Sequence, residues 1–178
     1  MNAVQLDEKL ILQMAKGDEN AFQELYRQTS SAVFGFALSI LRNGHDAEDV
    51  MHDAYIRCYM GAASYVPKGK PMAWLMTIVR NLAYNRLKSG RISENIDDYE
   101  HLGSVDTTDM TVERIVLEKA MEILEFQDRQ IVILHALTGM KHREIGELLD
   151  LPTSTVLSKY RRSLAKMRRE LEERGEQR

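Results

Sequence analysis

The side chains best suited to bind a ligand cluster near the end of the chain. Six of the eleven residues from 159 to 169 are basic and none is acidic, in a chain whose formal net charge is −3. Ser154, Thr155 and Ser158 precede them and share one side of a helical wheel with Arg162. Small hydroxyls that approach base edges, followed by guanidinium groups for guanine edges or phosphates, suit duplex DNA. The alternative is an amphipathic surface helix with a solvated basic face.

The segments around these residues have the layout of a helix-turn-helix DNA reader. Helical periodicity predicts segments over 128–137, 142–149 and 152–172, separated by breaks that contain Gly139 and Pro152. Pro152 suits a first helical turn, where its missing N–H would be unpaired anyway. A tight turn followed by a longer helix with hydroxyls and arginines indicates such a reader. In that longer helix the apolar side chains predict the face that enters the core: Val156, Tyr160, Leu164, Met167 and Leu171.

A second group of side chains could bind a metal ion. His45, Asp49, His52 and Asp53 lie near one side of a predicted helix, which would suggest a hydrolase on a helical bundle. No second segment offers a partner cluster, so we favour a carboxylate surface without a metal. Cys58 falls on the apolar stripe of the same helix, where a thiol is usually buried and inert. Without a nucleophile motif or a glycine-rich phosphate loop, we expect no cofactor and no enzyme activity.

The elements that must position these residues are helices. Up to about residue 87 the pattern is helical, with breaks at 17–18, 43–44 and 67–71 and an N-cap at Asp18. Residues 88–111 hold six acidic and two basic residues and no apolar face, which predicts a flexible acidic linker. A further helix is expected over 112–126. We therefore expect an all-α fold with two small helical domains, 1–87 and 112–178, joined by the linker 88–111.

The composition agrees with a folded, helix-rich protein. The chain has 178 residues, of which 44% are hydrophobic and 29% charged, and only three are proline. No apolar run approaches the roughly 20 residues of a membrane-spanning helix. The N-terminus lacks the pattern of a secretory signal, and Cys58 has no partner for an internal disulfide. We expect a cytoplasmic location.

Three segments in a fixed order carry a family resemblance. Residues 46–59 read DAEDVMHDAYIRCY, and residues 73–86 read AWLMTIVRNLAYNR. The third segment is the helix-turn-helix, including Glu144-Ile145-Gly146 and Leu151-Pro152. Together they resemble the extracytoplasmic-function (ECF) sigma factors, group 4 of the sigma-70 superfamily of bacterial RNA polymerase. The resemblance implies a region-2 helical bundle over 1–87 and a region-4 helix-turn-helix over 112–178.

The resemblance also implies a role for each set of side chains. The residues that would bind the β′ clamp of the core polymerase are Asp46, Glu48, Asp49, Asp53 and Arg57. The residues that would hold the non-template strand of the −10 element are Tyr65, Lys68, Lys70, Asn81 and Asn85. The residues that would meet the −35 duplex are Thr155, Ser158, Lys159, Arg161 and Arg162.

These roles imply a sigma factor that directs promoter-specific initiation of transcription. Its partners would be the core RNA polymerase, through the β′ clamp and the β flap, promoter DNA, and an anti-sigma factor that could hold it near the membrane. The linker would thread polymerase channels that otherwise carry nucleic acid. The alternative is a stand-alone helix-turn-helix regulator of duplex DNA, which would leave the segments at 46–59 and 73–86 without an explanation.

Overall fold

The computed structural model describes residues 6–90 and 112–175, and these residues form helices without a β-strand. The N-terminal half contains α1 (Glu8–Met14), α2 (Glu19–Leu41), α3 (Gly44–Gly61), a 3-10 turn (Ala62–Ser64) and α4 (Pro71–Gly90). The C-terminal half contains α5 (Val112–Ile123), α6 (Phe126–Thr138), α7 (His142–Leu149) and α8 (Thr153–Gly175). The expected all-α fold is confirmed. The predicted linker lies almost entirely outside the described residues.

The breaks predicted for the N-terminal half coincide with the helix ends. Gly17 has a φ of 86°, a left-handed conformation that suits glycine after α1. The carboxylate of Asp18 accepts hydrogen bonds from the backbone N–H groups of Asn20 and Ala21 and so caps α2. The side chain of Asn43 does the same for α3 through the N–H of Asp46. Local capping chemistry therefore sets where these helices begin.

One predicted helix boundary in the C-terminal half was wrong. The sequence predicted a helix over 112–126, whereas α5 ends at Ile123 and α6 begins at Phe126, before the expected start at Asp128. Leu124 is buried between the two helices, at 6% exposure. An apolar residue that continues into the core keeps the hydrophobic pattern going across the break, so periodicity alone does not mark it.

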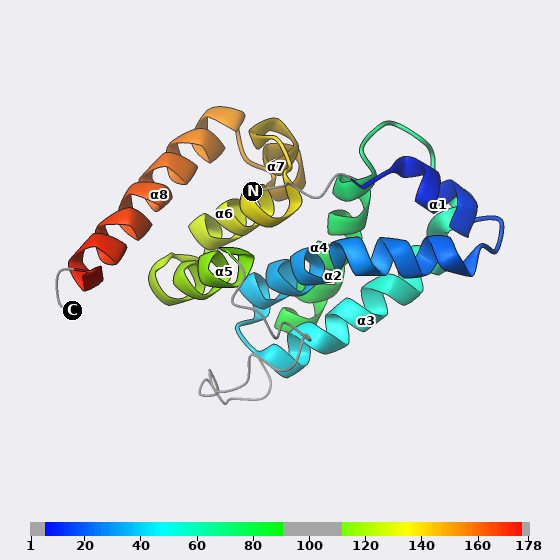
Figure 1. Cartoon of the computed structure of the whole chain (residues 1–178), viewed down its shortest axis with the longest axis horizontal. Coiled ribbons are helices and arrows are strands. Elements are labelled where there is room, and N and C mark those ends of the chain that lie inside the picture. The colour runs from blue at the N-terminus through cyan, green and yellow to red at the C-terminus, as the bar shows by residue number, and fades with distance from the viewer. Residues whose placement is uncertain (1–5, 91–111, 176–178) are drawn as a thin grey trace.

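The second part of α2 is the centre of the molecule. Every residue from Ala32 to Ile40 is buried, which is typical of a helix that is enclosed on all sides. Helices α3 and α4 cover α2 within the N-terminal half, and α6 packs against it from the C-terminal half (Figure 1). A Cβ placed on Gly35 would lie 2.8 Å from the Leu137 Cδ1, so a glycine allows this close approach. The two halves thus share one hydrophobic core, which the sequence did not predict.

The core of the N-terminal half also encloses the single cysteine. Cys58 is fully buried in α3, as predicted from the apolar stripe. Burial raises the pKa of its thiol to about 12.

Candidate nucleic-acid interface

Helices α7 and α8 form the helix-turn-helix predicted from the sequence. Gly139, which follows α6, has a φ of 68°, and Asp150, which follows α7, has a φ of 56°. The N–H of Leu151 donates to the carbonyl of Gly146 over 2.9 Å and closes the turn into α8. A Cβ on Gly146 would lie only 2.6 Å from the Leu151 carbonyl oxygen. The turn therefore depends on a residue without a side chain at position 146.

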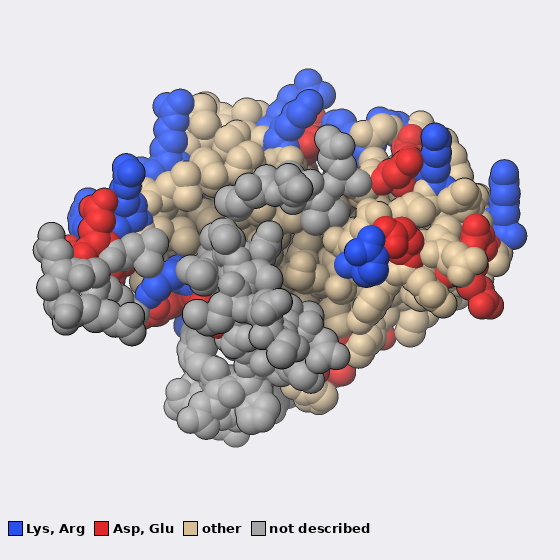
Figure 2. All heavy atoms as spheres, in the orientation of Figure 1, with Lys and Arg blue, Asp and Glu red and all other residues tan. Residues whose placement is uncertain are grey.

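The outer face of α8 presents the hydroxyl and arginine side chains expected of a DNA reader. Ser158, Arg161 and Arg162 are exposed, and Thr155 is half-buried. Figure 2 shows basic side chains projecting from the edge of the molecule that α8 forms. The Arg162 Nε lies 3.4 Å from the Ser158 carbonyl oxygen, one turn back along the same helix. These side chains can reach a ligand without rearrangement of the core.

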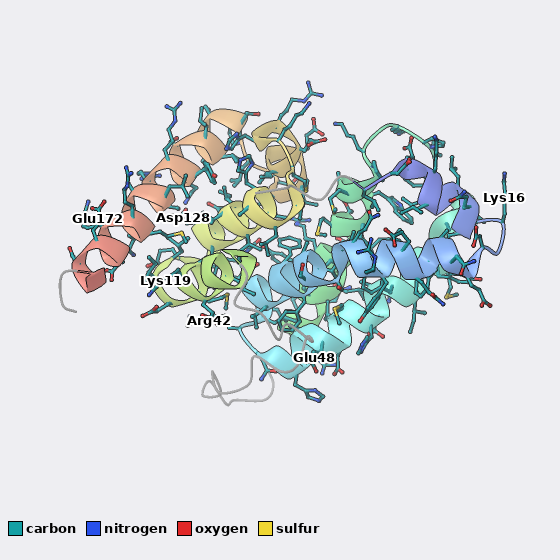
Figure 3. The ribbon with its side chains drawn as sticks, viewed as in Figure 1. Lys16, Arg42, Glu48, Lys119, Asp128 and Glu172 are labelled. Atoms are coloured by element: carbon teal, nitrogen blue, oxygen red, sulfur yellow. The ribbon has the colours of Figure 1, made fainter. Side chains whose placement is uncertain are left out.

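Lys159 differs from its neighbours because it already has a partner. Its ammonium donates to the carboxylate of Asp128 in α6 over 2.7 Å, and both side chains are more than three-quarters buried (Figure 3 labels Asp128). This ion pair joins α8 to α6 inside the C-terminal half. A phosphate would have to compete with Asp128 for Lys159, so the lysine contributes to the fold as well as to the positive charge of α8.

The apolar stripe of α8 was predicted correctly at only some positions. Val156 and Met167 are buried and Tyr160 packs against the core, as expected. The prediction for Leu164 was wrong, because it is 42% exposed, whereas Ser163 is 2% exposed. The buried face of α8 continues at regular helical spacing through Ser163, and Leu164 lies at its margin, so a small polar residue occupies a core position that the side-chain types do not signal. The side chain of Leu171 lies outside the described residues.

Three aromatic rings join the helices of the reader. His135 of α6 stacks on His142 of α7 with ring centroids 4.6 Å apart, and Tyr160 of α8 packs edge-on against both. His135 Nδ1 pairs with the carbonyl of Met140 over 2.8 Å. Burial, with contributions from His135 and Arg161, lowers the pKa of His142. Through these ring contacts the cluster joins α6, α7 and α8.

A second candidate surface consists of the loop before α4 and the exposed side of α4. Tyr65 is half-buried and its ring lies 4.8 Å from that of Trp74. Lys68 is exposed at the tip of the loop. Asn81 and Asn85 are exposed and lie one helical turn apart, so both amides can meet the same strand.

An acidic residue of α7 and another just after it pair with the cations beside this surface. The Lys70 ammonium donates to Glu147 over 3.0 Å, and the Arg80 guanidinium donates to Asp150 over 3.2 Å. The hydrogen bond from Lys70 lowers the pKa of Glu147. Tyr84 of α4 also packs against Phe126 of α6, with ring centroids 6.3 Å apart. In this arrangement the candidate −10 cation Lys70 is paired within the chain.

The acidic residues of α3 form a third surface. The Arg86 guanidinium donates to Asp46 over 2.6 Å and to Asp49 over 3.2 Å, which ties α3 to α4 and raises the pKa of Arg86. Asp53 and Arg57 are exposed, and Glu48 lies at the edge of the molecule near the start of α3 (Figure 3). The five predicted clamp-binding residues thus occur on one helix, and two of them share an arginine.

The metal alternative has no support in this part of the molecule. Within residues 6–90 and 112–175, no three His, Cys, Asp or Glu side chains are grouped so that they could hold an ion. Asp49 instead pairs with Arg86, as described above.

No described helix is long and apolar enough to cross a bilayer.

Several residues of these surfaces were missed in the sequence. Three of them pair with residues between 37 and 77 positions away in the chain: Arg80, Arg86 and Glu147. A pattern of local spacing carries no signal for such contacts. Glu8 was missed for the same reason. Its carboxylate lies against the loop that holds Tyr65, 57 residues later in the chain.

Comparisons with known proteins agree with both halves of this arrangement. The family model described as Sigma-70 region 2 matches residues 25–92, and the one described as Sigma-70, region 4 matches residues 114–167. The ECF RNA polymerase sigma factor SigK of Mycobacterium sp. (strain KMS) is 29% identical over 161 residues, covering 85% of this chain and 83% of SigK. SigW of Bacillus subtilis (strain 168) is 26% identical over 179 residues, covering 92% of this chain and 95% of SigW.

A solved structure has the same fold. The sigma factor RpoE of Bartonella quintana, in complex with the anti-sigma factor NepR, superposes with a TM-score of 0.62 at 22% identity. The match covers 85% of this chain and 96% of RpoE.

Proposed function

The chain belongs to the ECF sigma factors of the sigma-70 family, and from this membership we propose how its surfaces divide the work of promoter recognition. A sigma factor binds core RNA polymerase and promoter DNA and directs initiation of transcription. The observation that carries the assignment is the order of region 2 and region 4 in one chain, each presenting an exposed face with the chemistry that its task needs. The stand-alone regulator is set aside, because it leaves the match over residues 25–92 without a role.

In this proposal residues 1–87 are the region-2 domain and α3 binds the polymerase. Asp53 and Arg57 offer exposed charges for the β′ clamp. The carboxylates of Asp46 and Asp49 are held in position by their ion pairs with Arg86. Glu48 adds a further carboxylate beside them. Charge complementarity of this kind mainly sets the association rate and the register of docking.

The −10 element is captured by the loop before α4 and by α4 itself. Single-stranded bases stack on aromatic rings and their phosphates attract cations, and amides supply hydrogen bonds to base edges. Tyr65, Lys68, Asn81 and Asn85 provide these groups on neighbouring surfaces. Lys70 joins them when it is released from Glu147.

Residues 112–178 are the region-4 domain, and α8 enters the major groove of the −35 duplex. Ser158, Arg161 and Arg162 are exposed there, and Thr155 lies one turn earlier. Lys159 adds positive charge while it holds α6 through Asp128. Residues 88–111 connect the two domains and carry the negative charge proposed to thread the polymerase.

Further partners and the location follow from the family. Sigma factors as a family are not enzymes, and we propose no catalytic activity and no cofactor for this chain. A protein that acts with RNA polymerase works in the cytoplasm. The structure of RpoE with an anti-sigma factor supports a protein inhibitor for this chain as well, and the β flap is the proposed site for region 4 on the polymerase.

Run-off transcription tests the proposed function. Purified core polymerase of the native host is incubated with genomic fragments, with or without the chain. We expect discrete transcripts only when both proteins are present. A gel-shift assay on the same fragments separates the alternative, because a stand-alone regulator would retard duplex DNA without polymerase. Absence of any initiated transcript across the fragment set would overturn the proposal.

A further inference from the structure

The loop that carries Tyr65 and Lys68 is held by a residue from outside the region-2 match. Glu8, the first residue of α1, precedes the matched residues 25–92. One of its carboxylate oxygens, Oε1, accepts three hydrogen bonds from the loop. The Tyr65 hydroxyl donates over 2.5 Å, and the backbone N–H groups of Lys68 and Gly69 each donate over 3.0 Å.

The geometry of the loop fits this single acceptor. Gly69 has a φ of 68°, and a left-handed residue at a turn lets successive N–H groups point to one anion. A Cβ on Gly69 would meet nothing within 4 Å, so the conformation and not a lack of space requires glycine there. Among the described residues, Glu8 supplies the only acceptor that reaches the N–H groups of Lys68 and Gly69.

Helix α1 is packed against the core, so the position of Glu8 at its start is well defined. Ile11 and Met14 are buried at 0% and 2% exposure, and they fasten α1 to the core. The Asp7 side chain caps the helix through the N–H of Lys9. By contrast, Val66 at the start of the loop is 63% exposed. The rigid helix therefore restrains a loop whose middle, residues 66–69, is exposed.

A carboxylate beside a strand of DNA would by itself repel phosphates. Here the donors of the loop spread its negative charge, and the hydrogen bond from Tyr65 lowers the pKa of Glu8. A loop that is already ordered loses less conformational entropy when it receives a ligand.

We propose that Glu8 is a positioning residue for the −10 element: it holds the loop of residues 65–70 in the conformation in which Tyr65 and Lys68 receive the non-template strand. This inference rests on the proposed function, because it concerns how the same strand is bound. Glu8 does not touch the DNA in this account. Its effect passes through the three donors that it orders.

The test uses full-length variants assembled with core polymerase. Glu8→Ala removes the acceptor, and Glu8→Gln keeps an oxygen at the same position without the charge. Glu19→Ala is the matched control, because Glu19 is the first residue of α2 after the capping Asp18 just as Glu8 is the first residue of α1 after Asp7. The probe is a fork-junction DNA taken from a promoter mapped by run-off transcription, with its single-stranded −10 segment either native or scrambled.

We expect Glu8→Ala to lower the preference for the native over the scrambled strand by about 10-fold, a typical value for one lost base contact. Glu8→Gln should retain most of the preference, and Glu19→Ala all of it. Core binding should be the same for the four proteins. In NMR hydrogen exchange, the Lys68 and Gly69 amides should be protected in the native chain and in Glu8→Gln but not in Glu8→Ala.

The outcomes separate this inference from the proposed function. If the native chain initiates on no fragment, the proposed function fails. If the native chain initiates and Glu8→Ala discriminates the strands as Glu19→Ala does, only the role of Glu8 fails. Tighter strand binding by Glu8→Ala would show that Glu8 competes with DNA for the loop donors, which also overturns the positioning role.

Discussion

The Arg129 guanidinium of α6 donates from Nε to the carbonyl oxygen of Ser39 in α2 over 3.0 Å. Ser39 belongs to the last turn of α2, where carbonyl groups have no partner within the helix. A second nitrogen of Arg129 lies 3.4 Å from the carbonyl of Leu124, just after α5. One buried cation therefore meets the negative ends of two helices, one from each half of the chain. Burial lowers its pKa to about 10, so it is still charged at neutral pH.

Loss of the Arg129 side chain should destabilise the protein and weaken the contact between its halves. Arg129→Ala is expected to cost about 2–3 kcal/mol, because a charged hydrogen-bond donor is removed from buried carbonyls. The stability of Arg129→Lys should lie between that of the native protein and that of Arg129→Ala, because lysine keeps the charge but not the forked geometry of the guanidinium. Urea unfolding measures the loss in free energy of unfolding. Small-angle X-ray scattering measures whether the two halves of the chain move apart. Arg169→Ala, a change at an exposed residue of α8, serves as the control, and equal losses in both variants would contradict the role of Arg129.

A methyl group at Gly146 should disrupt the DNA-reading domain. The Cβ would meet the backbone carbonyl of Leu151 at 2.6 Å, and a backbone atom cannot move aside as a flexible side chain can. We expect Gly146→Ala to lower the free energy of unfolding by about 1–3 kcal/mol. The control is Gly61→Ala, where the nearest atom, of Trp74, lies at an ordinary 3.5 Å. Differential scanning calorimetry compares the two, and a Gly146→Ala domain as stable as the control would contradict the close approach.

Local signals in the sequence were sufficient to predict most of the helices. Caps such as Asp18, turn glycines such as Gly139 and the 3.6-residue period act over a few positions, so they can be recognised without a fold. The contact of Gly35 with Leu137 joins residues about a hundred positions apart and depends on how whole helices pack. No local pattern encodes that distance, which is why the shared core was missed.

Charge reversal at Asp53 should weaken polymerase capture more cleanly than reversal elsewhere on α3. Asp53 is exposed, whereas Asp46 also bonds Arg86 and so contributes to the packing of α3 on α4. Asp53→Lys is expected to lower affinity for core polymerase by about 10-fold through like-charge contact with the partner. Fluorescence anisotropy with labelled protein measures the affinity. Glu19→Lys on α2 is the matched control, and unchanged binding by Asp53→Lys would remove that residue from the docking face.

Removal of the Arg162 guanidinium should weaken recognition of the −35 element alone. The side chain is exposed on the outer face of α8, so Arg162→Ala is expected to cost about 1–3 kcal/mol of duplex binding and to leave core binding intact. Lys159→Ala should also lower thermal stability, because Lys159 pairs with Asp128. Abortive initiation is measured on templates with and without a −35 element. An equal loss by Arg162→Ala on both templates would contradict its assignment.

The C-terminal domain should lose stability below neutral pH through His142. Its folded pKa is lowered by burial, by His135 and by Arg161, so the unfolded chain takes up a proton first as the pH falls through its usual value of 6.5. Stability is therefore complete above that pH and falls below it. His142→Phe keeps the ring contact with Tyr160 but cannot titrate. Urea unfolding between about pH 5.5 and 7.5 should show a shallower slope for the variant, and parallel curves would contradict the prediction.

The residues that modulate each surface were harder to predict than the surfaces themselves. The basic and hydroxyl residues of α8 can be recognised in the sequence as a DNA-binding surface from their side-chain types. The pairing of Lys159 with Asp128 cannot, because it depends on how α8 packs on α6. Likewise Glu8 looks like any acidic residue in a first helical turn. Its contact with the loop of Tyr65 exists only because α1 lies against the 3-10 turn and the loop after it in the folded chain.

The enclosed Cys58 sets a limit on how this chain could respond to oxidants. It is the one sulfhydryl in the sequence, and at its raised pKa of about 12 almost none of it is the nucleophilic thiolate that peroxides attack. With solvent also excluded from the sulfur, alkylating and oxidising reagents reach it only when α3 opens. An oxidative signal that acts through a thiol would therefore have to be sensed by another molecule and relayed to this chain by binding.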